Sequence, residues 1–206
     1  MPRPSKGSIG LAASDLDPLL REIRACRVCA AFMPHEPRPI VQAAPGARIL
    51  IIGQAPGTRV QASGRPFTDP SGDRLRDWMG VDEAVFYDAG RIAIAPMGFC
   101  FPGLDAAGAD LPPRKECAPL WQKKLLDQLG DVRLTLLVGL HAQRFHLGSQ
   151  VRKTMTDTVR EAEAFGPDYL PLPHPSWRNS AWLRKNPWFE AKILPMLRCR
   201  IKELLQ

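Results

Sequence analysis

The sequence predicts an α/β fold: a single three-layer α/β/α domain in which helices cover both faces of a central parallel sheet. Two observations predict it. Short, wholly apolar runs alternate along the chain with longer segments of helical periodicity, which favours parallel strands joined by helical crossovers. The 206 residues are 45% hydrophobic and show no internal repeat, which suits one core. We expect this domain to span residues 14–206, behind a flexible N-terminal tail at 1–13.

Four segments are predicted to be strands because each is short, apolar and bounded by turn residues. They lie at 49–52, 91–95, 134–139 and 169–172. The first has four apolar residues in succession, which is typical of a parallel strand buried on both faces.

Helices are predicted between and around these strands. The first, at 14–24, has apolar residues recurring on one face and Ser14 or Asp15 as a cap. Further helices are expected at 72–79, 114–129, 141–147, 153–164 and, with a kink at Pro195, at 188–205.

Charge and hydropathy narrow the class of protein. Lys and Arg number 28 against 21 Asp and Glu, a net charge of +7, which favours a polyanionic partner such as nucleic acid. No apolar run approaches the ~18 residues of a membrane-spanning helix. The N-terminus lacks the apolar stretch of a secretory signal, so we expect a cytoplasmic protein that acts at the nucleoid.

A sharp turn follows the first strand. Residues 53–57 read Gly-Gln-Ala-Pro-Gly, and Gly-Arg-Pro-Phe follows at 64–67. Glycine and proline make the chain turn there, and bare backbone N–H groups can approach a ligand. Ligands of open α/β sheets bind at the carboxyl ends of strands. The turn therefore marks a site, and its chemistry depends on Gln54.

Four of the five cysteines form a pattern that suits a metal. Cys26 and Cys29 are a C-x2-C pair, and Cys100 and Cys117 follow after 70 and 16 intervening residues. A short pair with two distant thiols fits a four-thiolate site for zinc or an iron–sulfur cluster. The alternative is a set of buried, inert thiols. Cys199 lies apart and is expected in the core.

A histidine between two prolines ends the last predicted strand. His174 is followed by Ser176, Trp177, Arg178 and Asn179. At a strand end, His174 is placed to donate a hydrogen bond to a developing anion. Ser176 can anchor a phosphate oxygen, and Trp177 or Arg178 can enter a base stack. The alternative is a loop in which the histidine caps neighbouring backbone.

Phe67 and Asp69 follow the second turn motif. An isolated Phe is usually a core residue, but Phe67 comes after a rigid turn, where its ring can stack on a planar base. Asp69 is ordinarily a turn or helix-cap residue. It is also the carboxylate nearest in sequence to Gln54.

Together these residues resemble the uracil-DNA glycosylase superfamily, and most closely its iron–sulfur branch, family 4. Members of that branch share a C-x2-C pair near the N-terminus and a strand followed by G-E-x-P-G and G-R-P-F. A third cysteine, a fourth soon after and a late H-P-S loop complete the pattern. This chain has all of these in order over residues 26–179, with an atypical Gln54 in the first motif.

The resemblance implies a central four-stranded parallel sheet and a monomer that acts on DNA containing a damaged base, without a membrane. It implies hydrolysis of the N-glycosidic bond of uracil or another deaminated base, which leaves an abasic site. It also implies a [4Fe-4S] cluster, with zinc as the alternative, on Cys26, Cys29, Cys100 and Cys117. On this basis Gln54 and His174 are expected in catalysis, and Trp177, Arg178 and Asn179 on DNA. The base would contact Gly53, Ala55, Pro56, Gly57, Phe67 and Ser176.

The chain departs from the family pattern at two positions. Gln54 replaces a glutamate, so Asp69 is predicted to position the water instead. Pro96 stands where the branch has an asparagine that reads the uracil edge. Backbone groups of Met97 or Gly98 would then read the base, or the base differs, hypoxanthine being one candidate.

Two other interpretations stay open. Gln54 and Pro96 favour a DNA- or abasic-site-binding protein that kept this fold and lost efficient hydrolysis. A nucleotide-binding α/β protein with a zinc site is the third, but the sequence has neither G-x4-G-K-[ST] nor G-x-G-x-x-G.

Overall fold

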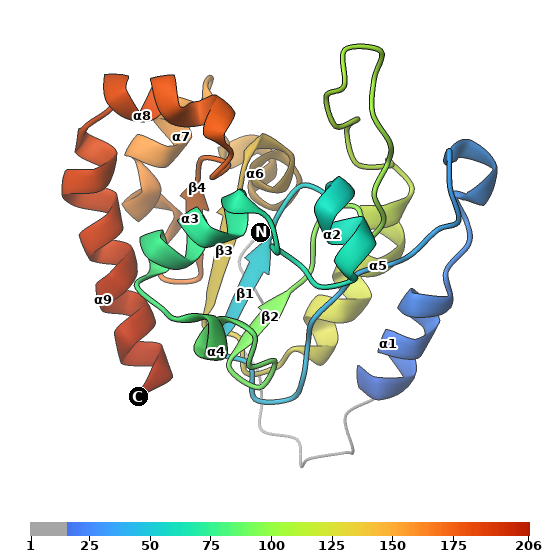
Figure 1. Cartoon of the computed structure of the whole chain (residues 1–206). Helices are drawn as coiled ribbons and strands as arrows, with labels where there is room; N and C mark the ends of the chain where they lie inside the picture. Colours follow the sequence, from blue (N-terminus) through green and yellow to red (C-terminus); the bar gives the residue numbers. More distant parts are fainter. Residues whose placement is uncertain (1–15) are drawn as a thin grey trace.

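Within residues 16–206, which the computed structural model describes, four parallel strands form one sheet in the order β2-β1-β3-β4 (Figure 1). The strands are β1 (Ile49–Ile52), β2 (Ile92–Ile94), β3 (Leu134–Val138) and β4 (Tyr169–Leu172). Each lies within a segment predicted from the sequence, and the α/β architecture is as expected. The tail predicted at 1–13 lies outside the described residues.

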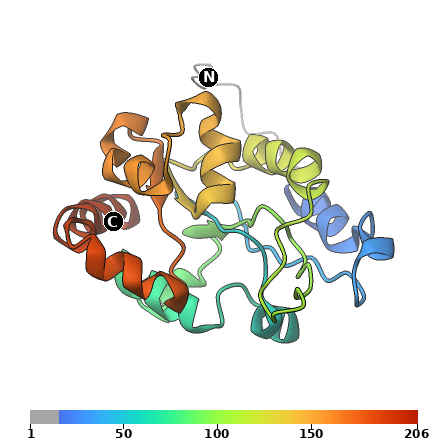
Figure 2. The same ribbon diagram turned by 90° about the horizontal axis from the view of Figure 1, so that it is seen from above.

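Helices surround this sheet. Their bounds are α1 (Leu16–Ala25), α2 (Thr58–Ser63), α3 (Pro70–Met79), α4 (Glu83–Phe86), α5 (Cys117–Gln128), α6 (Leu140–Leu147), α7 (Met155–Arg160), α8 (Ser180–Lys185) and α9 (Leu194–Leu205). Figure 2 shows α9 and α5 on opposite sides of the strands. The sheet is therefore the middle of three layers.

Strand β1 illustrates how the two cores are divided. Leu50 and Ile52 pack with α1 and α5, whereas Ile49 and Ile51 pack with α3 and α9. Alternate side chains of a strand point to opposite faces, so a wholly apolar strand can fill both layers. All four side chains are buried, each contributing roughly 1.5–3 kcal/mol by its removal from water.

The two outer strands differ in how their free edges are covered. Along β2, the backbone of Gln42 exchanges hydrogen bonds with Ile94 at 3.0 and 2.7 Å, and its side chain donates to the Ile92 carbonyl at 2.8 Å. On the opposite edge, β4 contains Pro171, which pairs in register with Leu137 of β3. Proline has no N–H to donate, which restricts it to edge strands.

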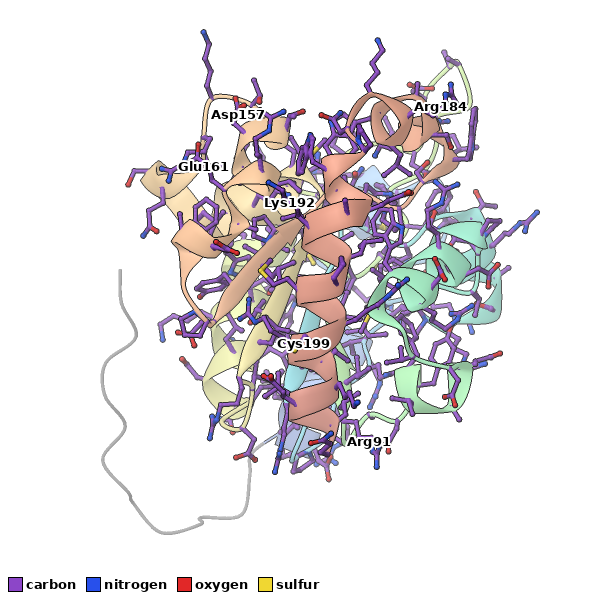
Figure 3. The ribbon with its side chains drawn as sticks, turned by 90° about the vertical axis from the view of Figure 1, so that its left-hand side faces the viewer. Arg91, Asp157, Glu161, Arg184, Lys192 and Cys199 are labelled. Carbon is purple, nitrogen blue, oxygen red and sulfur yellow. The ribbon has the colours of Figure 1, made fainter. Side chains whose placement is uncertain are left out.

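The helix predicted at 188–205 is divided in the structure. Residues Phe189–Ile193 form a wide π-helical turn, and α9 begins at Leu194 with Pro195 in its first turn. Proline is tolerated at this position because the first N–H groups of a helix have no intrahelical acceptor. The prediction that Cys199 lies in the core is wrong: it is exposed on α9 (Figure 3), and its thiol contacts Glu203.

Three short helices, α2, α4 and α8, were not predicted from the sequence. The helix expected at 153–164 is also interrupted: α7 ends at Arg160, and a 3-10 turn follows at Ala162–Phe165. None of the helices in the described part of the chain is long and apolar enough to cross a membrane.

Candidate active site

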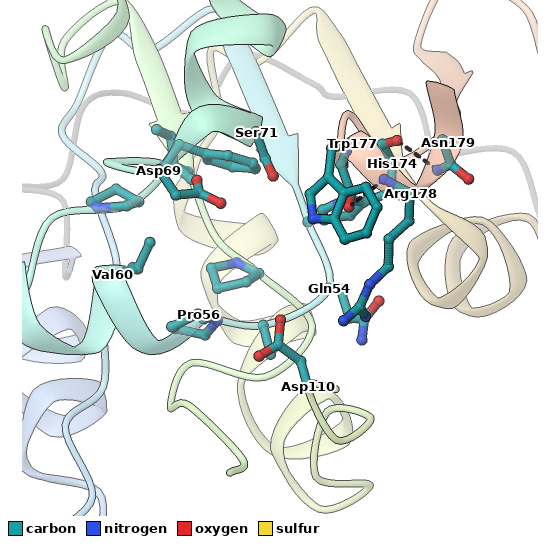
Figure 4. Close-up of a pocket in the computed structure, with 18 of the residues that line it drawn as sticks. Gln54, Pro56, Val60, Asp69, Ser71, Asp110, His174, Trp177, Arg178 and Asn179 are labelled. Carbon is teal, nitrogen blue, oxygen red and sulfur yellow. Dashed lines mark hydrogen bonds between the residues drawn. The ribbon is translucent and has the colours of Figure 1, made fainter. Parts of the chain in front are cut away.

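A cavity of about 400 Å³ opens at the carboxyl edge of the sheet. The turn after β1, the start of α3 and the loop after β4 form much of its wall (Figure 4). Most residues predicted for the site line it: Gly53, Gln54, Ala55, Pro56, Gly57, Phe67, Asp69, His174, Ser176, Trp177, Arg178 and Asn179. Segments more than a hundred residues apart in sequence thus meet at one cavity.

The turn after β1 is tied to the loop after β2. The N–H of Met97 donates to the Gly53 carbonyl at 2.9 Å, and the N–H of Gly98 donates to the Gln54 carbonyl at 3.0 Å. Met97 is buried and does not line the cavity, whereas Pro96 does. Of the backbone groups predicted to read a base, these two N–H groups are therefore engaged in holding the turn.

Phe67 has a left-handed backbone conformation with φ of 55°, which a bulky residue rarely adopts. Its carbonyl accepts hydrogen bonds from the Tyr87 hydroxyl at 3.0 Å and from the Arg76 guanidinium at 3.3 Å. These contacts fix the conformation, and the ring lies against Gly53, within 3.2 Å of where a Cβ there would be. Glycine at 53 lets the ring form a flat wall of the cavity.

Asp69 lies at the start of α3. Its carboxylate accepts the Gly72 N–H at 3.3 Å and so caps the helix, with Pro70 in the first turn. It also lines the cavity. Asp69 thus has the ordinary capping function that its sequence position suggested, in addition to its place at the site.

The protonation of His174 follows from one hydrogen bond. The N–H of Ser176 donates to Nδ1 of His174 at 3.2 Å, so the neutral ring carries its proton on Nε2. Burial lowers the pKa of His174, while the charges of Asp69 and Asp110 act in the opposite direction. The ring is therefore a neutral donor to a ligand in the cavity.

The loop that carries His174 is held from two sides. The Asn179 side chain donates to the His174 carbonyl at 2.7 Å. From α3, Arg74 donates to the carbonyls of Pro175 at 3.2 Å and Ser176 at 3.0 Å. The Ser176 hydroxyl accepts the Arg178 N–H at 3.3 Å, so it is already engaged in the turn. No motif around Arg74 indicates this contact, which joins segments about a hundred residues apart.

Trp177 projects from this loop beside the cavity. Trp177 is 72% exposed, and such exposure is unusual for a large aromatic residue. The guanidinium of Arg178 lies 5.9 Å from the ring centroid. An exposed aromatic ring next to a cation at a cavity rim suits contact with stacked bases and phosphates.

Sequence reasoning missed several lining residues. Pro66 lies inside the Gly-Arg-Pro-Phe motif and Ile94 inside the second predicted strand, and Val60 and Ser71 belong to the neighbouring helices α2 and α3. Asp110 and Leu111 come from the segment between β2 and α5, which has no periodic pattern.

The four patterned cysteines line a second, smaller cavity. Cys26 follows α1, Cys29 lies in the next turn, Cys100 follows β2 and Cys117 begins α5. Burial raises the pKa of both Cys100 and Cys117 to about 12, and neighbouring thiols add to the effect. The Phe99 N–H donates to Sγ of Cys117 at 3.3 Å.

Four thiols at one cavity are the type of ligand that zinc and iron–sulfur clusters bind. In residues 16–206, no three His, Cys, Asp or Glu side chains are placed so that they could hold a metal ion. All four cysteines line the same small cavity. Thiols that repel one another as anions need a cationic group between them to be deprotonated together.

Comparison with known proteins gave two matches. The solution NMR structure of a candidate uracil DNA glycosylase from Methanosarcina acetivorans is 15% identical, with a TM-score of 0.47. The match covers 79% of this chain and 97% of that one. Residues 40–198 match the family model of the uracil DNA glycosylase superfamily. That match spans the strands and both walls of the cavity, and the chain belongs to the uracil DNA glycosylase superfamily.

Proposed function

We propose that this protein is a DNA glycosylase that hydrolyses the N-glycosidic bond of uracil or another deaminated base and leaves an abasic site. One observation carries the proposal. The cavity has an aromatic wall at Phe67 and a neutral hydrogen-bond donor at His174, beside the turn after β1. Membership of the superfamily supports the same reaction class.

The reaction needs charge to move onto the leaving base. A flipped base stacks on Phe67, and its oxygen accepts a hydrogen bond from Nε2 of His174 as negative charge gathers there. Removal of a donor of this kind by mutation lowers the reaction rate by about 10²-fold to 10³-fold. Because Ser176 fixes the tautomer, His174 is oriented before the substrate arrives.

Water must reach the sugar from the other side of the breaking bond. The amide of Gln54 lines the cavity and can orient that water, but it cannot accept a proton. Asp69, predicted from the sequence for this role, is one carboxylate of the cavity, and Asp110 is another.

Base selection cannot follow the branch pattern here. Pro96 lines the cavity and offers neither a donor nor an amide, and the N–H groups of Met97 and Gly98 are engaged. Selection then depends on the shape of the cavity and on His174. Hypoxanthine and xanthine are therefore candidate substrates beside uracil.

DNA contacts are assigned to the rim. Trp177 is exposed enough to stack on or wedge between bases, and Arg178 can pair with phosphate. The net charge of +7 supports such a partner.

For the four cysteines we propose a [4Fe-4S] cluster, with zinc as the alternative. The four cysteines that line one small cavity support the proposal, since thiolates are the ligands of iron–sulfur clusters and of structural zinc. Such a group would tie α1, the segment after β2 and the start of α5 together covalently. Hydrolysis needs no electron transfer, so this role is structural.

A cleavage assay tests the proposal. Duplexes and single strands carrying uracil, hypoxanthine, xanthine or thymine are incubated with the protein and then treated with alkali, which breaks the strand at abasic sites. We expect cleavage for at least one deaminated base and loss of cleavage in His174→Gln. Gln54 and Pro96 favour a second candidate, a DNA- or abasic-site-binding protein. Tight DNA binding without cleavage in any series would select that candidate.

A further inference from the structure

A small hairpin at residues 103–111 projects beside the cavity, on the side of the carboxyl ends of the strands (Figure 1). Its two arms pair through Leu104 and Asp110, and the Leu111 N–H donates to the Gly103 carbonyl at 3.0 Å. At the tip, the carboxylate of Asp105 accepts the N–H groups of Ala107 at 2.9 Å and Ala109 at 2.8 Å. These hydrogen bonds give the hairpin a defined conformation from its base to its tip.

The base of the hairpin is packed against the body of the protein. Gly103 has φ of 100°, and a Cβ there would lie 3.1 Å from the ring of Pro34. Leu111 lines the cavity next to Asp110. These contacts place the last residues of the hairpin at the wall opposite the His174 loop (Figure 4).

The carboxylate of Asp110 faces the turn after β1. Its Oδ2 lies 3.6 Å from where a Cβ at Gly57 would be, three residues after Gln54. It has no hydrogen bond or ion pair with any residue in 16–206, although its charge acts on His174 across the cavity. Asp69, by contrast, already accepts the Gly72 N–H. Asp110 is the carboxylate of this wall with both oxygens available.

We propose that Asp110 accepts the proton of the attacking water, a step that Gln54 cannot perform; this inference rests on the proposed glycosylase function. The water oxygen forms a bond to C1′ as the bond from C1′ to the base nitrogen breaks. That electron pair leaves on the base, stabilised by Nε2 of His174. One water proton moves to Asp110, which is exposed and returns it to solvent when the product leaves.

The test compares Asp110→Asn, Asp69→Asn and the exposed control Asp127→Asn in single-turnover cleavage of the best substrate. For Asp110→Asn we expect a rate about 10²-fold to 10³-fold lower, with DNA affinity equal or higher because a negative charge is removed. A signal from 2-aminopurine beside the lesion reports base flipping and should not change. Asp69→Asn should lose less than Asp110→Asn, and Asp127→Asn should match the unmodified protein.

A rescue experiment separates a proton acceptor from a residue that only shapes the wall. Adding Gln54→Glu to Asp110→Asn restores a carboxylate in the turn, and we expect at least a tenfold recovery of the rate. A rate within threefold of the unmodified protein for Asp110→Asn, or no recovery in the double variant, overturns the assignment of Asp110 alone. Failure of the unmodified protein to cleave any base overturns the proposed function and this inference with it.

Discussion

The carbonyl oxygen of Phe67 lies only 1.8 Å from where a Cβ at Gly72 would be. No side chain fits at residue 72 unless the strained turn that presents the Phe67 ring is displaced. The first turn of α3 and the aromatic wall of the cavity are therefore built as one unit. Asp69 joins them, since it accepts the Gly72 N–H.

Gly72→Ala should consequently destabilise the protein and displace the ring. Overpacking of this kind costs about 1–3 kcal/mol, and here the clash is with backbone, which relaxes least. Urea unfolding measures the loss. Asp77→Ala, an exposed change on the same helix, should stay within about 0.5 kcal/mol of the unmodified protein. Equal stability of the two variants would contradict the packing described.

His174→Gln should lower the cleavage rate by about 10²–10³, equivalent to about 2.7–4 kcal/mol. The pH dependence is a second check. Burial lowers the pKa of His174, so the active neutral ring is present above that lowered value and is lost as the pH falls through it. The acid limb of the rate profile should therefore lie below about pH 6.5, the ordinary value for histidine.

The carboxylates that face His174 should shift that limb. Asp69 and Asp110 both raise the pKa of the ring, against the larger effect of burial. Asp69→Asn should therefore move the acid limb to lower pH, measured on the residual activity. A shift to higher pH would contradict the placement of its charge near His174.

His146 should make the protein sensitive to acid. Its Nε2 is buried without a hydrogen-bond partner among residues 16–206, and burial lowers its pKa to about 4. Between about pH 6.5 and that value, the unfolded chain binds a proton that the folded chain excludes, so stability falls as the pH is lowered. His146→Phe should flatten the dependence of the urea midpoint on pH. His141→Gln, an exposed change on the same helix, should leave most of the pH dependence of the urea midpoint intact.

Trp177→Ala should weaken DNA binding without weakening the fold, because the ring is largely exposed. Loss of one stacking contact costs about 1–3 kcal/mol, which lowers the affinity roughly fivefold to 150-fold. Fluorescence anisotropy with a labelled duplex measures it, and thermal unfolding provides the control. A fall in unfolding temperature without a change in affinity would argue for a packing role instead.

Cys100→Ser should remove the proposed cluster and destabilise the contacts between α1 and α5. The unmodified protein is expected to be brown with iron and sulfide bound, and the variant colourless. Cys199→Ser is the matched control, because that thiol is exposed on α9, away from the other four. A colourless unmodified protein that contains zinc would overturn the cluster in favour of the alternative.

The strands could be predicted because their signal is local. Residues 49–52 are apolar at every position and form β1 with the predicted bounds. Residues 169–172 likewise form β4 with the predicted bounds. The exposed position of Cys199 was missed, although spacing could have shown it. Leu194, Leu197 and Ile201 form the buried stripe of α9, and Cys199 lies off that stripe.

The rest of the site depends on contacts between distant segments. Motifs marked the Gln54 turn and His174, but nothing local to Arg74 indicates that it holds the loop at Ser176. Asp110 lies in a hairpin without periodicity, stabilised by the side chain of Asp105 rather than by a hydrophobic pattern. Backbone groups of Met97 were predicted to read the base in place of a side chain at Pro96, but the Met97 N–H donates to the Gly53 carbonyl, a contact that no local pattern indicates.

The blocked edges of the sheet affect how readily copies of the protein aggregate at high local concentration. Gln42 occupies the hydrogen-bonding groups of β2, and Pro171 removes a donor from β4. Exposed strand edges are where separate molecules add to one another's sheets and aggregate. Neither edge here is a good template for that. Joining of two copies through the edges of their sheets is therefore disfavoured even where many copies are close together.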